Sequence, residues 1–265
     1  IAREDEGLWE TRLEILAGER FAIANVVGKQ RLKIQVFVQS VDESLELKRR
    51  FGGRVETLPD QNWVALSQTD PVLVKVRDKL VVTSVSDPES LQVLRDQYSD
   101  RGVLTIPAEL AFGTGDHETT STCLRFLVDV ASERQKRARP WCLLDLGTGT
   151  GVLAIAAKQL GATRALGWEN DPLALAVAEK NVRANGLDPG AVEMGSQDVL
   201  SWKPAAAQWD VICANMFSEI LIASFRKIRR ALKPDGTLII SGILREQADD
   251  TLAAAKRAGL EMTLA

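Results

Sequence analysis

Apolar and polar residues alternate with a period of two in the first part of the chain. Residues 8–16 (LWETRLEIL) and 32–38 (LKIQVFV) show this alternation, which is typical of antiparallel strands buried on one face. A short helix is expected over residues 40–51, and a further strand over residues 54–58. These elements together predict a small α+β domain with ferredoxin-like elements over residues 1–60.

In the second part of the chain, short apolar runs alternate with stretches of helical periodicity, which is typical of a parallel sheet covered by helices. A strand is expected just before the glycines of residues 143–151, and further strands are expected at residues 164–168, 192–194, 209–214 and 237–241. Helices are expected at residues 121–132, 152–160, 217–232 and 245–258, and between Asp171-Pro172 and Asn185-Gly186. We therefore expect a doubly wound, Rossmann-like α/β domain over residues 106–265, without the complete antiparallel strand pair that would finish such a sheet.

The stretch between these two domains has mixed signals. Residues 80–85 are expected to form a strand and residues 88–97 a helix, and Asp-Pro pairs mark turns. We interpret residues 61–105 as a connector that packs on the second domain.

A glycine-rich loop follows the first strand of the second domain, in the sequence LLDLGTGTG. Gly147, Gly149 and Gly151 place no side chain between the backbone and a ligand, and the N–H groups of the next helix are unpaired. The loop has neither the ending of a phosphate-binding P-loop nor the GxGxxG spacing of a pyrophosphate site. Asp145 would repel a pyrophosphate and attract a cation, so we expect a ligand with a positive centre, such as S-adenosylmethionine (SAM). The alternative is a glycine turn that serves only the packing of the chain and binds no ligand.

An adenosine cofactor also needs hydrogen-bond acceptors at the ends of the next strands. Glu169 ends the second strand of the domain, 22 residues after Gly147, and is expected to bind the ribose, with Asn170 beside it. Asp198 is expected to bind the adenine amine, although a turn or helix-capping aspartate fits its sequence equally well. Trp168 would either flank the adenine or belong to the core.

A second glycine-containing loop, AFGTGDHETT at residues 111–120, precedes the helix expected at residues 121–132. Its two glycines around Thr114 indicate an unusual backbone, and its two threonines stand where a helix N-cap belongs. It contains His117, the only histidine in the chain. In one interpretation, Phe112, Thr114 and Thr120 of this loop contact the cofactor. The alternative is a surface loop that caps a helix and leaves His117 exposed.

Composition narrows the function classes. Lys and Arg total 33 and Asp and Glu 36, so the net charge of −3 does not favour a direct nucleic-acid partner. Cys123, Cys142 and Cys213 show no CxxC spacing, which argues against a zinc knuckle or another metal site and for reduced, buried thiols in a cytosolic setting. No secretory signal and no apolar run of membrane-spanning length is present, so we expect a cytoplasmic enzyme without a membrane partner.

Three segments carry a resemblance to a known family: the loop at residues 110–120, LLDLGTGTGVLAIAA, and ANMFSEIL at residues 214–221. They resemble the PrmA family of ribosomal protein methyltransferases, which modify large-subunit ribosomal protein eleven. The resemblance covers most of the chain from about residue 106 onward. It implies a small N-terminal domain that recognises the protein substrate and a loop that closes over SAM. It also implies cofactor contacts from Thr120, Gly147, Glu169 and Asn215.

The expected activity is SAM-dependent methyl transfer to amines of a ribosomal protein, at lysine side chains or an N-terminal amine. Catalysis then consists mainly of aligning acceptor, methyl group and sulfur in line and excluding water. A lysine acceptor must also lose its proton, which burial in a closed pocket favours. We expect the Asn215 amide to hold the methionine or acceptor end. His117 either relays the proton or fixes its loop, and the second role is preferred.

Two alternatives stay open at this point. The first is a methyltransferase that acts on a different protein or on a small molecule, because the motif beginning at Asn215 lacks the proline that the family usually has there. The second is a SAM-binding protein without catalytic activity. Neither the glycine loop nor the acidic strand ends distinguish these alternatives from the expected activity.

Overall fold

The computed structural model describes residues 9, 21–25, 32–36, 38, 40–56, 71–107, 115, 117–188 and 190–263. The chain divides into two compact units, Ile1–Asn62 and Trp63–Ala265. Phe112 and Thr114, expected to contact the cofactor, lie outside the described residues. Of the strand expected at residues 8–16 only Trp9 is described, and it is helical.

The described residues of the N-terminal unit include a two-stranded antiparallel sheet and the helix that follows it. The elements are β1 (Phe21–Asn25), β2 (Leu32–Val36) and α2 (Val41–Phe51). The α2 helix agrees with its prediction, and it begins at Ser40, whose hydroxyl accepts from the Glu43 N–H. The sequence FAIAN of β1 lacks period-two alternation, so no strand was expected there. The strand expected at residues 54–58 is wrong for its described part, residues 54–56.

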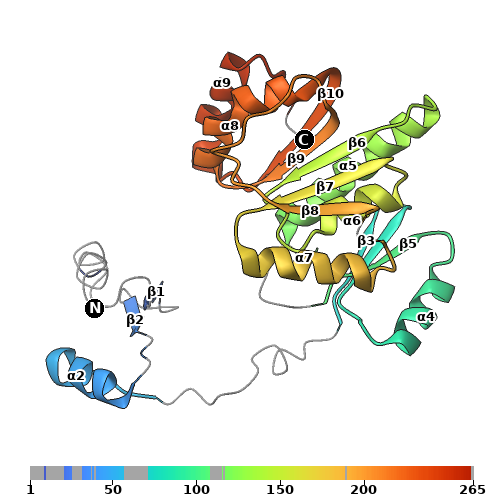
Figure 1. Cartoon of the computed structure of the whole chain (residues 1–265). Helices are drawn as coiled ribbons and strands as arrows, with labels where there is room; N and C mark the ends of the chain where they lie inside the picture. The colour runs from blue at the N-terminus through green and yellow to red at the C-terminus, as the bar shows by residue number, and fades with distance from the viewer. Residues whose placement is uncertain are drawn as a thin grey trace. The chain divides into compact units, whose positions relative to one another are not determined.

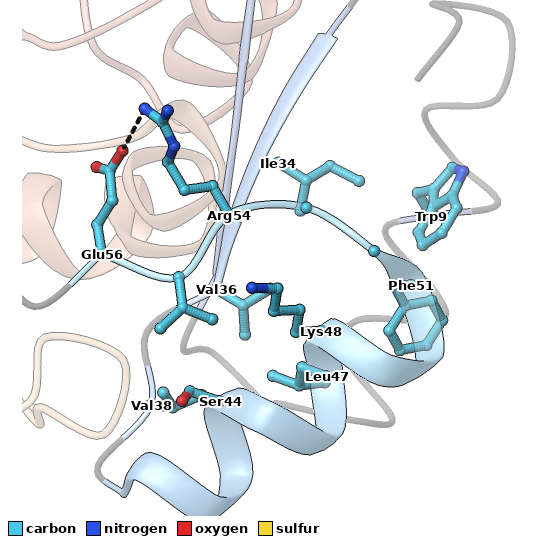
Figure 2. Close-up of a pocket in the computed structure, with 13 residues that line it drawn as sticks. Trp9, Ile34, Val36, Val38, Ser44, Leu47, Lys48, Phe51, Arg54 and Glu56 are labelled. Carbon is cyan, nitrogen blue, oxygen red and sulfur yellow. Dashed lines mark ion pairs between the residues drawn. The ribbon is translucent and has the colours of Figure 1, made fainter.

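A cavity of about 340 Å³ lies within this unit. Figure 2 shows its apolar wall, which includes Ile34 and Val36 of β2 and Leu47 and Phe51 of α2. The Trp9 ring meets Phe51 edge to face, with 5.7 Å between the ring centroids. The described part of the unit therefore has an apolar hollow between its second strand and its helix.

The described part of the segment expected to be a connector, residues 71–105, is a folded part of the second unit. It contains β3 (Leu73–Val76), β4 (Leu80–Thr83), α4 (Pro88–Gln97) and β5 (Gly102–Thr105). β4 lies between the other two strands, antiparallel to β3 and parallel to β5. The strand and helix expected at residues 80–85 and 88–97 are present, whereas β3 and β5 were not expected. Both have only four residues, too few to show a clear period.

Five parallel strands form the main sheet of the described residues, in the order β10-β9-β6-β7-β8. The strands are β6 (Cys142–Leu146), β7 (Arg164–Glu169), β8 (Val192–Ser196), β9 (Trp209–Asn215) and β10 (Leu232–Ser241). The helices are α5 (Glu118–Lys136), α6 (Val152–Gln159), α7 (Pro172–Ala184), α8 (Ser218–Ala231) and α9 (Ala248–Arg257), with the short 3₁₀ helix η2 (Arg245–Gln247) before α9. This arrangement confirms the expected Rossmann-like α/β fold (Figure 1).

Helices cover both faces of the sheet. Successive residues of a strand therefore pack into two different apolar cores, one on each face. Leu143 packs into a core with residues of α5, α6 and α7, and its neighbour Leu144 packs into a second core with residues of α8 and α9. Among the described residues, no helix combines the length and apolarity needed to cross a bilayer.

Strand register brings the functional candidates to one edge of the sheet. The ends of β6, β7 and β9 are level, since Leu146 pairs with both Trp168 and Ala214. Asn215, the last residue of β9, pairs with Ser241 at the end of β10. Ligands of open α/β sheets bind outside the carboxyl ends of their strands, so the fold predicts a site at this edge.

Candidate active site

A cavity of about 780 Å³ lies at the carboxyl ends of the parallel strands, within the size range of small-molecule sites. The residues expected from the sequence that line it are His117, Gly147, Gly149, Glu169, Asn170, Asp198 and Asn215. Thr120, Asp145 and Gly151 were also expected at the site but lie outside this lining. The structure thus brings together residues from four strand ends and from the start of α5.

Two positions of the loop require glycine for different structural reasons. Gly147 lines the cavity with φ +67°, and a Cβ added there would lie 3.1 Å from Cγ of Met216, another lining residue. Gly151 has φ +80°, and a Cβ there would lie 2.8 Å from Met194 Cε. Gly151 therefore serves the packing of the loop on β8 rather than the cavity lining.

The Glu169 carboxylate is held by backbone donors from two loops. Its Oε2 accepts from the Gly149 N–H at 2.9 Å, and its Oε1 accepts from the N–H groups of Asn170 at 2.8 Å and Asp171 at 3.1 Å. These bonds fix the carboxylate at the cavity wall and tie the glycine loop to the end of β7. An ionised carboxylate has about four acceptor positions, so about one remains for a ligand hydroxyl.

Asp145 is buried beneath the glycine loop and is 1% exposed. Its Oδ2 accepts from the Thr148 hydroxyl at 2.5 Å, and its Oδ1 has no hydrogen-bond partner among the described residues. Burial raises the pKa of Asp145 from 3.8 to about 7; the hydrogen bond from Thr148 opposes this rise and the charge of Glu169 adds to it. A buried carboxyl group with one unpaired oxygen would favour a cationic ligand group bound next to the glycine loop.

Asparagine at position 145 is expected to make stability less dependent on pH. The folded protein keeps the Asp145 proton up to about pH 7, whereas an unfolded aspartate loses it near pH 3.8. The folded state binds more protons between these values, so its stability falls as pH rises through this window. We expect the unfolding free energy of Asp145→Asn, relative to the unmodified protein, to rise by roughly 2 kcal/mol between about pH 5 and about pH 8. Urea unfolding at both pH values measures this difference, and a pH-independent difference would refute it.

The start of α5 is tied to the end of β9. His117 is the N-cap of α5, and its Nδ1 accepts from the Thr119 N–H at 3.3 Å. The Asn215 amide nitrogen donates to the hydroxyls of Thr119 at 3.3 Å and Thr120 at 3.4 Å. Thr120 is only 2% exposed, so it positions Asn215 from below rather than lining the cavity.

Three further candidates stand at the side of the cavity near β7 and β8. Asp198 lines the cavity, but its Oδ1 also accepts from the Leu200 N–H at 2.8 Å, so both interpretations from the sequence fit its surroundings. Trp168 lines the cavity too, and its ring packs edge to face on Trp202 with 5.0 Å between centroids. Asn170 reaches Glu169 through its backbone N–H.

The sequence did not point to a further set of lining residues, most of which are apolar. The missed residues are Thr119, Gln197, Val199, Leu200, Met216, Phe217, Ile220, Gly242, Ile243 and Leu244. The residues that follow β9 and β10 could have been predicted, because they directly follow strands whose ends were expected at this edge of the sheet.

The described part of the chain contains three free cysteines. No three or more His, Cys, Asp or Glu residues within it are grouped to hold a metal ion. Cys123 and Cys213 are buried free thiols, and burial raises the pKa of Cys123 to about 12. Cys142 is only partly buried, contrary to the expectation for all three cysteines.

Comparisons with known proteins find relatives of this chain. A ribosomal protein L11 methyltransferase of Prochlorococcus marinus (strain MIT 9515) is 34% identical over 255 residues, covering 89% of this chain and 81% of the relative. One of Thiobacillus denitrificans (strain ATCC 25259 / T1) is 37% identical over 201 residues, covering 75% of this chain and 60% of the relative. The crystal structure of a ribosomal protein L11 methylase from Lactobacillus delbrueckii subsp. bulgaricus aligns with a TM-score of 0.55 and 25% identity, covering 73% of this chain and 93% of that one.

The chain spans about half the length of several curated relatives that it matches. The match to the enzyme of Heliobacterium modesticaldum, for example, covers 48% of that relative. The family model described as Ribosomal protein L11 methyltransferase (PrmA), by contrast, matches residues 2–264 of this chain. The chain therefore belongs to the PrmA family.

Proposed function

We propose that this protein is a SAM-dependent methyltransferase that transfers methyl groups to amines of ribosomal protein L11. The observation that carries the proposal is the arrangement at the ends of β6, β7 and β9 in a member of the PrmA family. There a backbone-held carboxylate, Glu169, and an amide, Asn215, line the same largely apolar cavity. A ribosomal substrate would place the reaction in the cytoplasm.

The residues of the cavity fit SAM chemically. Glu169 offers an acceptor to a ribose hydroxyl, and Gly147 and Gly149 expose backbone to the methionine part. The free, buried Oδ1 of Asp145 lies under this loop, and the cationic amino and sulfonium groups of SAM would favour the ionised form of this carboxyl, whose pKa is about 7. When bound, SAM supplies an electrophilic methyl group and a good leaving group.

The protein's own part in the reaction is to orient the acceptor amine and to exclude water. With its amide nitrogen donating to two threonine hydroxyls, Asn215 directs Oδ1 toward the cavity side beside Gly242. A carbonyl oxygen there accepts a hydrogen bond from an amine N–H and so orients the nitrogen lone pair. The apolar lining disfavours an ammonium ion, so it favours the neutral amine that can attack the methyl group.

The N-terminal unit provides a surface for a protein substrate. Its apolar cavity between β2 and α2 (Figure 2) is bordered by Lys48 and by Arg54, which pairs with Glu56 at 3.7 Å. An apolar hollow with a polar rim is typical of protein recognition sites. We assign this unit to substrate recognition.

His117 is expected to fix its loop rather than to relay a proton. Replacing it with alanine removes an N-cap, so SAM affinity should fall severalfold while kcat at saturating SAM stays within about twofold. Asparagine at position 117 can cap the helix and should restore the affinity. Calorimetry and initial-rate kinetics on both variants measure these effects. A large loss of kcat in both variants would instead assign the proton relay.

The proposal is tested by supplying methyl-labelled SAM together with purified ribosomal proteins and, separately, with a whole-cell extract. Label on ribosomal protein L11 is the expected result. Label only on another component of the extract would move the function to a different acceptor. SAM binding without label anywhere would identify a non-catalytic SAM-binding protein.

A further inference from the structure

Two large apolar side chains are exposed among the residues that line the cavity. Phe217 is 73% exposed and Leu244 is 62% exposed, and both line the cavity that contains Asn215. Phe217 precedes α8 and Leu244 precedes η2, so they follow the neighbouring strands β9 and β10. Exposed apolar groups gathered at a cavity mouth mark a surface that contacts a ligand or partner.

The loop that carries Leu244 passes directly against Asn215. Gly242 begins this loop with φ +84°, and a Cβ there would lie 2.9 Å from the Met216 carbonyl oxygen and 3.1 Å from Asn215 Oδ1. Any other residue would push the loop away from the amide. The loop therefore forms one side of the space in front of Asn215 Oδ1.

One side chain joins this loop to the turn that carries Phe217. Gln247 Oε1 accepts from the Ser218 hydroxyl at 2.8 Å, and Gln247 Nε2 donates to Glu219 Oε1 at 3.1 Å. The Gln247 backbone N–H also donates to the Leu244 carbonyl at 2.9 Å. Gln247 thus contacts the residues next to Phe217 with its side chain and contacts Leu244 with its backbone.

We propose that Gln247 is a positioning residue for the methyl acceptor, which holds Phe217 and Leu244 as two apolar walls around the alkyl stem of the substrate amine. This inference rests on the proposed function and adds the residues that set acceptor binding. Apolar walls leading to a carbonyl oxygen match a long aliphatic chain that ends in an amine. Gln247 itself is not among the residues that line the cavity, so it acts through Phe217 and Leu244.

Kinetics with ribosomal protein L11 as acceptor test the inference. Gln247→Ala should raise the KM for L11 by about fivefold to tenfold, because it removes the hydrogen bonds to the Ser218 hydroxyl and the Glu219 carboxylate, while kcat and the KM for SAM stay within twofold. Phe217→Ala and Leu244→Ala should raise the same KM by about tenfold each. Glu246→Ala, an exposed neighbour on the same turn, is the matched control and should change neither KM.

A double-mutant comparison separates positioning from a general structural role. Because Gln247 acts through the walls, adding Gln247→Ala to the Phe217→Ala/Leu244→Ala variant should raise the KM for L11 less than twofold further. A full additional fivefold rise, or an equal rise in the KM for SAM, would overturn the inference. An unchanged KM in Gln247→Ala would overturn it while the proposed function stands. Absence of transfer to L11 by the unmodified protein would overturn both.

Discussion

Replacing Glu169 with alanine is expected to weaken SAM binding by about a hundredfold. About one acceptor position of the carboxylate is free for a ribose hydroxyl, and a hydrogen bond to a charged group contributes roughly 1.5 to 3 kcal/mol. The same change removes the acceptor for the Gly149 N–H, which loosens the glycine loop that the methionine part would contact. Together these losses come to about 2.7 kcal/mol, which corresponds to the hundredfold change.

Isothermal titration calorimetry with SAM measures this effect. Glu193→Ala is a suitable control, because Glu193 is a carboxylate of the same sheet that pairs with Arg164 at 3.1 Å near the surface. That variant should bind SAM like the unmodified protein. Equal affinities of the Glu169 and Glu193 variants would remove Glu169 from the cofactor site.

Replacing Asn215 with alanine is expected to lower kcat by about a hundredfold. Its amide is anchored by Thr119 and Thr120, so its free oxygen has a defined position from which to orient the acceptor nitrogen. Misplacing a reacting group by about 1 Å can cost about a hundredfold in rate. The loss should appear mainly in kcat, because Glu169 and the glycine loop still hold the cofactor.

Single-turnover kinetics with saturating SAM and L11 measure this rate without the contribution of product release. A thermal unfolding curve of the same variant checks that the anchoring threonines still pack. If the single-turnover rate of Asn215→Ala lies within threefold of the unmodified rate, Asn215 has no part in orienting the acceptor.

The second domain could be predicted from the sequence because its signals are strong and repeated. The run before Gly147 is apolar and ends in glycines, and Asp171-Pro172 marks a capped helix start. Parallel strands buried on both faces give such continuous apolar runs. Glu169 and Asn215 could be placed at one edge because each ends a strand of the same parallel sheet.

Other features depend on contacts that no local pattern carries. β3 and β5 are stabilised by pairing with β4, so their four residues have little signal of their own. Gly151 looks like Gly147 in the sequence, but only tertiary packing against Met194 separates their roles. The contact of Gln247 with Ser218 joins residues 29 positions apart, and polar residues near a helix start are ordinarily solvated. Such long-range contacts determine which of the residues expected from the sequence line the cavity.

The intact mass of ribosomal protein L11, recorded before and after incubation with this protein and SAM, tests the central claim most directly. The account predicts a mass gain of whole methyl groups on L11 with the unmodified protein, and a gain about a hundredfold slower with Asn215→Ala. An unchanged mass of L11 with the unmodified protein, under conditions where calorimetry detects bound SAM, would contradict the account.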